Sequence, residues 1–131
     1  MIFGIGTDAV KLERVARLWE KFGMSFARRI LLAEELAVFS PQKRPVRFLA
    51  MRFAAKEAIV KAMGTGFANG MWVRDAGTVP NPLGQPQVIF SARGLRKCAE
   101  LGIAGGHLSL TDEDGLIIAF AVLMRTQGQT A

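Results

Sequence analysis

The sequence has a single cysteine and no apolar run as long as the roughly 18 residues of a membrane span. One cysteine cannot form an internal disulfide, so Cys98 fits a protein of a reducing compartment. Within the amphipathic segment 95–101, Cys98 is better interpreted as a small buried residue than as a nucleophile. The first residues lack the basic start and cleavage site of a signal peptide. We therefore expect a cytoplasmic protein that does not enter a membrane.

The charge is distributed unevenly along the chain, because the basic residues cluster in one part of it. Residues 11–61 contain twelve of the seventeen Lys and Arg but only five acids, so that this segment has a net charge of +7 and the remainder −1. A one-sided basic surface indicates an acidic partner, which could be a nucleic acid, an acidic protein or a polyanionic small molecule. A solvated face without a partner explains the same charge equally well.

With 131 residues, half of them apolar, the chain is long enough for one domain with a core, expected over 1–125, with a loose tail at 126–131. Periodicity and turn residues predict strands at 2–7, 72–79, 87–90, 107–111 and 116–124, a helix from Lys11 to Phe22, short helical pieces over 25–39, and helices at 46–63 and 91–101. This order predicts an α+β domain in which a mostly antiparallel sheet packs against one long helix. The last strand is apolar on both faces, so it lies centrally or packs against another copy of the protein.

The predicted helix at 46–63 contains a carboxylate in an apolar position. Its apolar stripe consists of Val46, Ala50, Phe53 and Val60. Glu57 lies on the same stripe, between Phe53 and Val60. Because a buried isolated charge is costly, Glu57 needs a charged partner, a metal ion or a proton.

Several further residues have both a functional and a purely structural interpretation. Lys61 can form an ordinary helix pair with Glu57, worth only about 0.2–0.5 kcal/mol. Asp8 can be the N-cap of the helix that follows it, and Gly64-Thr65-Gly66 a helix C-cap. His107, at the start of a strand, is more often structural than catalytic. Taken together, two acids, a lysine and a glycine-rich turn predict a site for a metal ion and phosphates.

The order of these motifs resembles one known family over residues 2–124. The matching motifs are Gly4-Ile5-Gly6-Thr7-Asp8 with Glu13-Arg14, Arg52-Phe53-Ala54-Ala55-Lys56-Glu57-Ala58 with Lys61 and Gly64-Thr65-Gly66, and His107-Leu108-Ser109-Leu110. They resemble the bacterial holo-acyl-carrier-protein synthases, which are small single-domain phosphopantetheinyl transferases. The resemblance implies transfer of phosphopantetheine from coenzyme A to a serine of acyl carrier protein, with release of adenosine bisphosphate, in fatty acid biosynthesis.

The resemblance also implies the roles of individual residues. Asp8 and Glu57 correspond to Mg²⁺ ligands, and Lys61 to a catalytic lysine that contacts the phosphates. Lys56 would face solvent or the coenzyme's terminal phosphate. The expected coenzyme-binding residues are Lys61, Gly64, Thr65, Gly66, Asn81, Pro82, Gly84, Pro86, His107 and Ser109. In the family the coenzyme lies between the subunits of a homotrimer, and His107 and Ser109 would come from the neighbouring chain.

The same resemblance implies that the basic segment 11–61 binds an acidic protein partner. Acyl carrier proteins are strongly acidic and dock on the first helices of these enzymes. Arg14 matches the docking arginine of the family, and the charges of Arg17, Lys21, Arg28 and Arg29 make these residues further docking candidates. Asp112 departs from the pattern, because many relatives have a histidine there. The acceptor of the serine proton stays open.

Two alternatives to this function are a degenerate relative that binds coenzyme A without turnover and a basic nucleic-acid-binding module. The intact set of Asp8, Glu57 and Lys61 argues against the first. The second lacks an aromatic ladder, a zinc-binding spacing and a recognition-helix pattern. We therefore expect coenzyme A and an acidic carrier protein as partners, and no nucleic acid.

Overall fold

The structure is a computed structural model that describes residues 1–128. Its elements, in chain order, are β1 (Ile2–Lys11), α1 (Leu12–Phe22), α2 (Met24–Ile30), α3 (Ala33–Val38), α4 (Pro45–Met63), β2 (Ala76–Pro80), β3 (Pro86–Phe90), α5 (Ala92–Leu101), β4 (Ile103–Glu113) and β5 (Leu116–Arg125). The predicted α+β class is confirmed. No helix among the described residues is long and apolar enough to cross a membrane.

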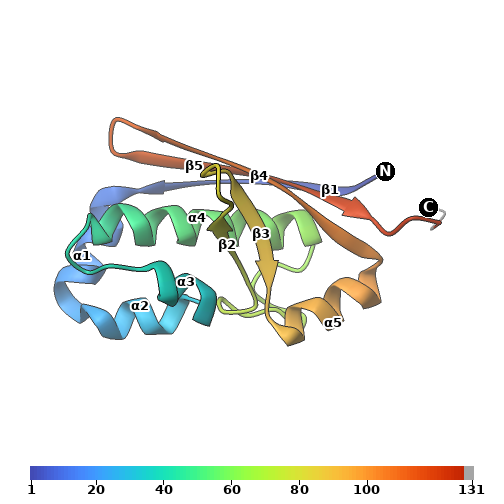
Figure 1. Cartoon of the computed structure of the whole chain (residues 1–131), viewed down its shortest axis with the longest axis horizontal. Coiled ribbons are helices and arrows are strands. Elements are labelled where there is room, and N and C mark those ends of the chain that lie inside the picture. Colours follow the sequence, from blue (N-terminus) through green and yellow to red (C-terminus); the bar gives the residue numbers. More distant parts are fainter. Residues whose placement is uncertain (129–131) are drawn as a thin grey trace.

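The main sheet has three antiparallel strands in the order β1-β5-β4, and β2 and β3 form a separate antiparallel hairpin. β5 is the central strand, with Ala119 opposite Asp8 of β1 and Leu110 of β4. Figure 1 shows the sheet covering one side of α4, with α2, α3 and α5 on the other side of that helix. The long helix is therefore the middle layer of the molecule.

This position explains why α4 is buried on most of its circumference. Leu49, Ala50, Ala54, Ala55 and the aliphatic residues from Ala58 to Val60 are all buried, and no single stripe marks the core side. The predicted stripe was therefore only partly right, because its members Val46 and Phe53 are half-buried. Glu57 is half-buried as well. It lies on the side of the helix that faces Asp8 of β1.

Two glycines in β1 set how closely the sheet approaches α4. A Cβ on Gly6 would lie 2.2 Å from the carbonyl oxygen of Ala58, and one on Gly4 would lie 2.1 Å from that of Ala62. No other residue type fits against the helix backbone at these distances. The contact places the next inward-facing residue of β1, Asp8, beside the C-terminal half of α4.

The opposite face of the sheet is open. Along β5, Ile117, Ala119, Ala121 and Leu123 are buried, whereas Ile118 and Phe120 are 41% and 39% exposed. Ile5 of β1 is 60% exposed. The central position predicted for this apolar strand is confirmed. Its packing against another copy of the protein stays a prediction.

Some element boundaries differ from the prediction. β1 continues to Lys11, four residues beyond the predicted end, because it pairs with β5 along its whole length. β4 begins at Ile103 rather than His107 for the same reason. β2 begins only at Ala76, because the chain before it forms a turn in which the Asp75 backbone N–H donates to the Trp72 carbonyl. The loose tail expected at 126–131 stays a prediction. Its first residue, Thr126, donates its backbone N–H to the Gly102 carbonyl, and residues 129–131 lie outside the described part.

Candidate active site

Asp8 lies in the middle of β1 and faces α4. Its Oδ1 is 3.2 Å from Nζ of Lys61, which also donates to the backbone carbonyl of Thr7 at 3.0 Å. The Asp8 side chain is 17% exposed and that of Lys61 51%. The helix-cap interpretation of Asp8 was wrong: α1 begins only at Leu12, its N-cap is Lys11, and Asp8 is part of a strand.

Glu57 lies one helical turn before Lys61 on α4. Burial raises the pKa of its carboxyl group, and the negative charge of Asp8 raises it further. The charges of Lys61 and Arg14 oppose this rise. The proposed helix pair between Glu57 and Lys61 is replaced by the pair of Lys61 with Asp8, so that the lysine bridges the helix and the strand.

Two carboxylates that approach each other in a half-buried place fit a divalent cation. The rise in the Glu57 pKa caused by Asp8 shows that the two charges interact unfavourably when no cation is present. The described residues contain no group of three His, Cys, Asp or Glu that could hold a metal by themselves. This donor set suits Mg²⁺, which proteins hold through one or two carboxylates while water and substrate phosphates complete its octahedron.

The glycine-rich turn after α4 is a helix C-cap, as one sequence interpretation had it. Gly64 has a φ of 81° and donates its N–H to the Lys61 carbonyl, and the N–H groups of Thr65 and Gly66 donate to the Val60 carbonyl. Positions for a Cβ on Gly64 and Gly66 have no atom within 4 Å. The turn is therefore open to a ligand, but its three N–H groups already donate to carbonyl groups in the last turn of α4.

The segment from Asn81 to Pro86 is the turn of the β2–β3 hairpin. Asn81 holds this turn with its own side chain, since its Oδ1 accepts from the N–H groups of Leu83 and Gln85. Gly84 and Pro86, with Arg52, line a cavity of about 220 Å³ between the hairpin and α4. Asn81 therefore stabilises the loop, and Gly84 and Pro86 form its accessible surface near α4. Pro82 is exposed.

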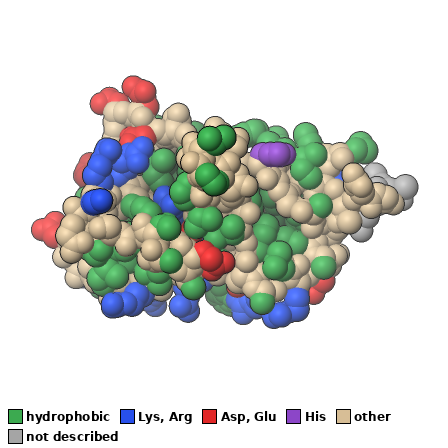
Figure 2. Space-filling view, in the orientation of Figure 1, with side chains coloured by type: hydrophobic (Ala, Val, Ile, Leu, Met, Phe, Trp, Pro, Cys, Tyr) green, Lys and Arg blue, Asp and Glu red, His purple; other side chains and the backbone are tan. Residues whose placement is uncertain are grey.

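His107 and Ser109 are separated from Asp8 and Glu57 by the main sheet. Both are exposed on β4, opposite Val122 and Phe120 of β5, and share the uncovered face of the sheet with Phe120. Figure 2 shows the histidine side chain at the surface. One chain therefore keeps this pair and the two carboxylates on opposite faces of the sheet.

The basic residues expected to dock a partner are exposed on α1 and α2. Arg14 lies close enough to lower the pKa of Glu57, whereas Arg17 is paired with Glu13 at 3.2 Å. Lys21 lies 5.3 Å from the ring centroid of Phe22, and Arg28 and Arg29 are exposed on the last turn of α2. Arg14 is thus the docking candidate whose charge acts on Glu57.

Lys56 does not face solvent or a ligand, contrary to the expectation. It is fully buried, and its Nζ donates to Oε1 of Glu35 and, at 2.8 Å, to the carbonyl of Ala76. Glu35 also accepts from the backbone N–H groups of Leu32 and Thr78. The prediction failed because burial of Lys56 depends on a partner 21 residues away in α3, which helix periodicity cannot reveal.

Sequence reasoning also missed two other features that support this region. Gly4 and Gly6 were considered only as part of a family motif, and their function in bringing β1 against α4 was missed. A small residue at every second strand position is the signal that could have indicated it. Asp112, the departure from the family pattern, forms an ion pair with Arg47 at 2.6 Å. That pair joins the start of α4 to the end of β4.

Comparison with known proteins decides the family. Residues 4–121 match the sequence profile of the 4'-phosphopantetheinyl transferase superfamily. The chain belongs to this superfamily. A holo-[acyl-carrier-protein] synthase of Neisseria meningitidis is 46% identical to this phosphopantetheinyl transferase over 122 residues, which cover 93% of this chain and 98% of that protein.

Solved structures agree with this assignment. The crystal structure of the synthase from Neisseria meningitidis matches the transferase with a TM-score of 0.89 and 44% identity, covering 95% of this chain and 100% of that one. The Helicobacter pylori synthase in complex with coenzyme A matches with a TM-score of 0.79 and 27% identity, over 92% and 99% of the two chains. The fold of this transferase is therefore that of the holo-[acyl-carrier-protein] synthases.

Proposed function

We propose that this phosphopantetheinyl transferase is a holo-[acyl-carrier-protein] synthase that acts in fatty acid biosynthesis. It transfers the phosphopantetheine group of coenzyme A to a serine of apo acyl carrier protein and releases adenosine 3',5'-bisphosphate. The observation that supports this most directly is the meeting of Asp8, Glu57 and Lys61 in a chain that matches synthases over nearly its whole length. The reaction takes place in the cytoplasm, in keeping with a single cysteine that is free and buried.

The chemistry assigns a task to each of the three residues. In the reaction the serine oxygen attacks the β-phosphorus of coenzyme A, and the bond from that phosphorus to the bridging diphosphate oxygen breaks. Asp8 and Glu57 would hold Mg²⁺, which when bound neutralises negative charge on the diphosphate. Lys61, which bridges to Asp8 in this structure, has an exposed ammonium group that can contact the same phosphates as a point charge.

The coenzyme would extend from these carboxylates along two segments. The open turn at Gly64, Thr65 and Gly66 adjoins Lys61 and lets the diphosphate approach the backbone closely, because glycine has no Cβ there. The hairpin loop with Asn81, Pro82, Gly84 and Pro86 would lie near the adenine end, beside the cavity that Gly84 and Pro86 line.

The active enzyme is a homotrimer with sites between subunits. The exposed Ile5, Ile118 and Phe120 form an apolar face that an adjoining subunit would cover. His107 and Ser109 lie on this same face, directed away from their own Asp8. They can complete a site only in a neighbouring chain, where His107 would contact the coenzyme's phosphates.

Acyl carrier protein would dock on the exposed basic residues of α1 and α2. Arg14 is the best placed, because its charge already reaches Glu57. Arg17, Lys21, Arg28 and Arg29 add to the field that attracts an acidic partner, and such rim charges act mainly on the association rate.

The function is tested by the intact mass of apo acyl carrier protein after incubation with this protein, coenzyme A and Mg²⁺. We expect a gain of one phosphopantetheine group that is lost when EDTA is added. Glu57→Gln and Asp8→Asn should each lower the rate by at least about 10²-fold, the cost typical of losing one electrostatic contact to a transition state. Binding of coenzyme A without any mass gain would instead identify a catalytically degenerate relative, and full activity of either variant would refute the metal assignment.

A further inference from the structure

One large cavity in the described part of the chain lies away from the proposed catalytic site. It is wide open to solvent, has a volume of about 760 Å³, and is lined by the start of α3, the turn before β2 and the start of α5. None of its lining residues belongs to the metal, coenzyme or docking sets named above. Its volume falls within the range of about 300–1,000 Å³ that is common for small-molecule sites.

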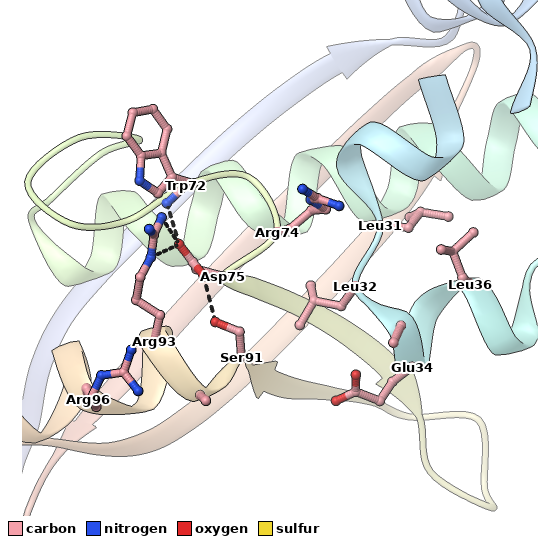
Figure 3. A pocket seen from close by; sticks show the side chains of 12 residues that line it. Leu31, Leu32, Glu34, Leu36, Trp72, Arg74, Asp75, Ser91, Arg93 and Arg96 are labelled. Atoms are coloured by element: carbon pink, nitrogen blue, oxygen red, sulfur yellow. Dashed lines mark hydrogen bonds and ion pairs between the residues drawn. The ribbon is translucent and has the colours of Figure 1, made fainter. Parts of the chain in front are cut away.

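The cavity carries an excess of guanidinium groups. Three arginines line it, namely Arg74, Arg93 and Arg96. Figure 3 shows Arg93 extending from α5 toward Asp75, while Arg74 lies between Trp72 and Leu31 in this view. Each guanidinium presents a planar fork of N–H donors that matches the oxygens of a phosphate or carboxylate.

Only one of these arginines is neutralised by the protein. Asp75 is buried and accepts from Arg93 at 2.8 Å, from the Ser91 hydroxyl at 2.7 Å and from the Trp72 backbone N–H at 2.8 Å. Within residues 1–128, neither Arg74 nor Arg96 forms an ion pair, and both are exposed. The remaining acid of the lining, Glu34, is exposed on α3 and also forms no ion pair there. The positive charge of the cavity is therefore available to a ligand.

An aromatic and apolar wall adjoins this charge. Trp72 is 59% exposed although it is a large hydrophobic side chain, and the guanidinium of Arg93 lies 5.7 Å from its ring centroid. Leu31, Leu32 and Leu36 form the wall on the side of α3. A cavity that combines an exposed indole surface with two guanidinium groups outside any ion pair suits a molecule that has a flat ring and an anionic group.

We propose that this cavity is a second ligand site, which binds a phosphorylated small molecule with an aromatic ring, of the nucleotide type. The phosphate pairs with Arg74 and Arg96, and the ring packs on Trp72. The buried Asp75 is a fixed part of the site, because it holds Arg93, the first turn of α5 and the backbone of Trp72 in place.

Trp72 offers a local signal for the test, because the chain has only two tryptophans and a Trp19→Phe variant assigns their indole N–H resonances. Adenosine 5'-monophosphate, adenosine and inorganic pyrophosphate would be titrated into the metal-free protein while these resonances are followed by NMR. We expect adenosine monophosphate to shift the Trp72 signal to saturation, pyrophosphate to bind more weakly and adenosine to have no effect.

Three variants separate this cavity from the catalytic site and from general charge. Arg74→Ala/Arg96→Ala should weaken binding at Trp72 at least tenfold, and both residues are exposed, so the fold should be kept. Arg28→Ala/Arg29→Ala removes the same charge elsewhere and should leave binding within twofold. Lys61→Ala should likewise leave the Trp72 shift intact.

Three results would overturn the proposal. The first is an unchanged affinity in Arg74→Ala/Arg96→Ala, and the second is a Trp72 resonance that none of the phosphate compounds shifts. The third is a shift caused only by a hexaglutamate peptide, which would make the cavity a protein-docking surface. None of these outcomes affects the mass-gain assay, so the second site and the proposed transferase function can fail independently.

Discussion

Lys56 and Glu57 are neighbours in sequence but meet opposite environments. Adjacent helix residues point about 100° apart, so that one side chain enters the layer of α3 and β2 and the other faces β1. Lys56 is fully buried with Glu35, whereas Glu57 is half-buried beside Asp8. A single helix can thus present one charged residue for stability and the next for chemistry.

The raised pKa of Glu57 predicts how stability depends on pH without metal. The folded state keeps the Glu57 proton to a higher pH than the unfolded state does, so the free energy of unfolding falls as pH rises from the ordinary carboxyl range through the raised pKa. The penalty is complete only above the raised pKa. We therefore expect Glu57→Gln to unfold at a higher urea concentration than the wild type at pH 7 in EDTA.

The difference should disappear in acid, where Glu57 is protonated in both states. Saturating Mg²⁺ with coenzyme A should also reverse the order, because only the wild type has both carboxylates to hold the ion. A Glu57→Gln variant that is less stable than the wild type at pH 7 in EDTA would contradict the assigned cause of the pKa shift.

At the scale of elements, the contact between β1 and α4 depends on the absence of two side chains. Gly6→Ala would place a methyl group 2.2 Å from the Ala58 carbonyl oxygen, which forces the strand away from the helix. We expect a loss of about 1–3 kcal/mol in the free energy of unfolding, as for overpacked cores, and a larger fall in kcat because Asp8 moves with the strand. Urea unfolding and the mass-gain assay measure the two effects. Thr7→Ala, at an exposed position of the same strand, is the control and should keep its stability within about 0.5 kcal/mol.

Helix α1 should determine affinity for the carrier protein. Arg14→Ala is expected to raise the KM for acyl carrier protein severalfold with little change in the KM for coenzyme A, because it removes one exposed charge of the docking face. The effect should shrink as salt rises toward 0.5 M. Lys97→Ala on α5 removes the same charge far from α1 and serves as the control. Equal changes in both KM values would argue against docking on α1.

The order of elements and the class of fold could be predicted from the sequence, because they rest on local periodicity and turn residues. Helices α1, α4 and α5 lie where the periodicity placed them. The predicted end of β1 and the predicted start of β4 were wrong, because the length of each strand depends on its pairing with β5 and not on its own sequence pattern. The Asp8–Lys61 and Glu35–Lys56 pairs could not be predicted for the same reason: each joins residues that only the tertiary fold brings together.

At the scale of the whole molecule, the position of His107 predicts that activity depends on assembly of the subunits. If each site combines Asp8 and Glu57 of one subunit with His107 of the next, His107→Ala and Glu57→Gln trimers are both impaired. Mixing the two variants under subunit exchange should then restore part of the activity, because some interfaces pair an intact Glu57 with an intact His107. The mass-gain assay measures the recovery, and a mixture no more active than its two components would place His107 outside the shared site.

The buried pair of Glu35 and Lys56 links α3, β2 and α4, so that these three elements are expected to unfold together. Glu35 holds the N–H of Leu32 at the start of α3, the N–H of Thr78 in β2 and the ammonium of Lys56 in α4. A helix of six residues would ordinarily fray on its own, but separating α3 leaves an uncompensated charge inside the protein. We therefore expect α3 to open only when the whole protein unfolds, and the buried pair to hold α4 rigid at Lys56, the residue before Glu57.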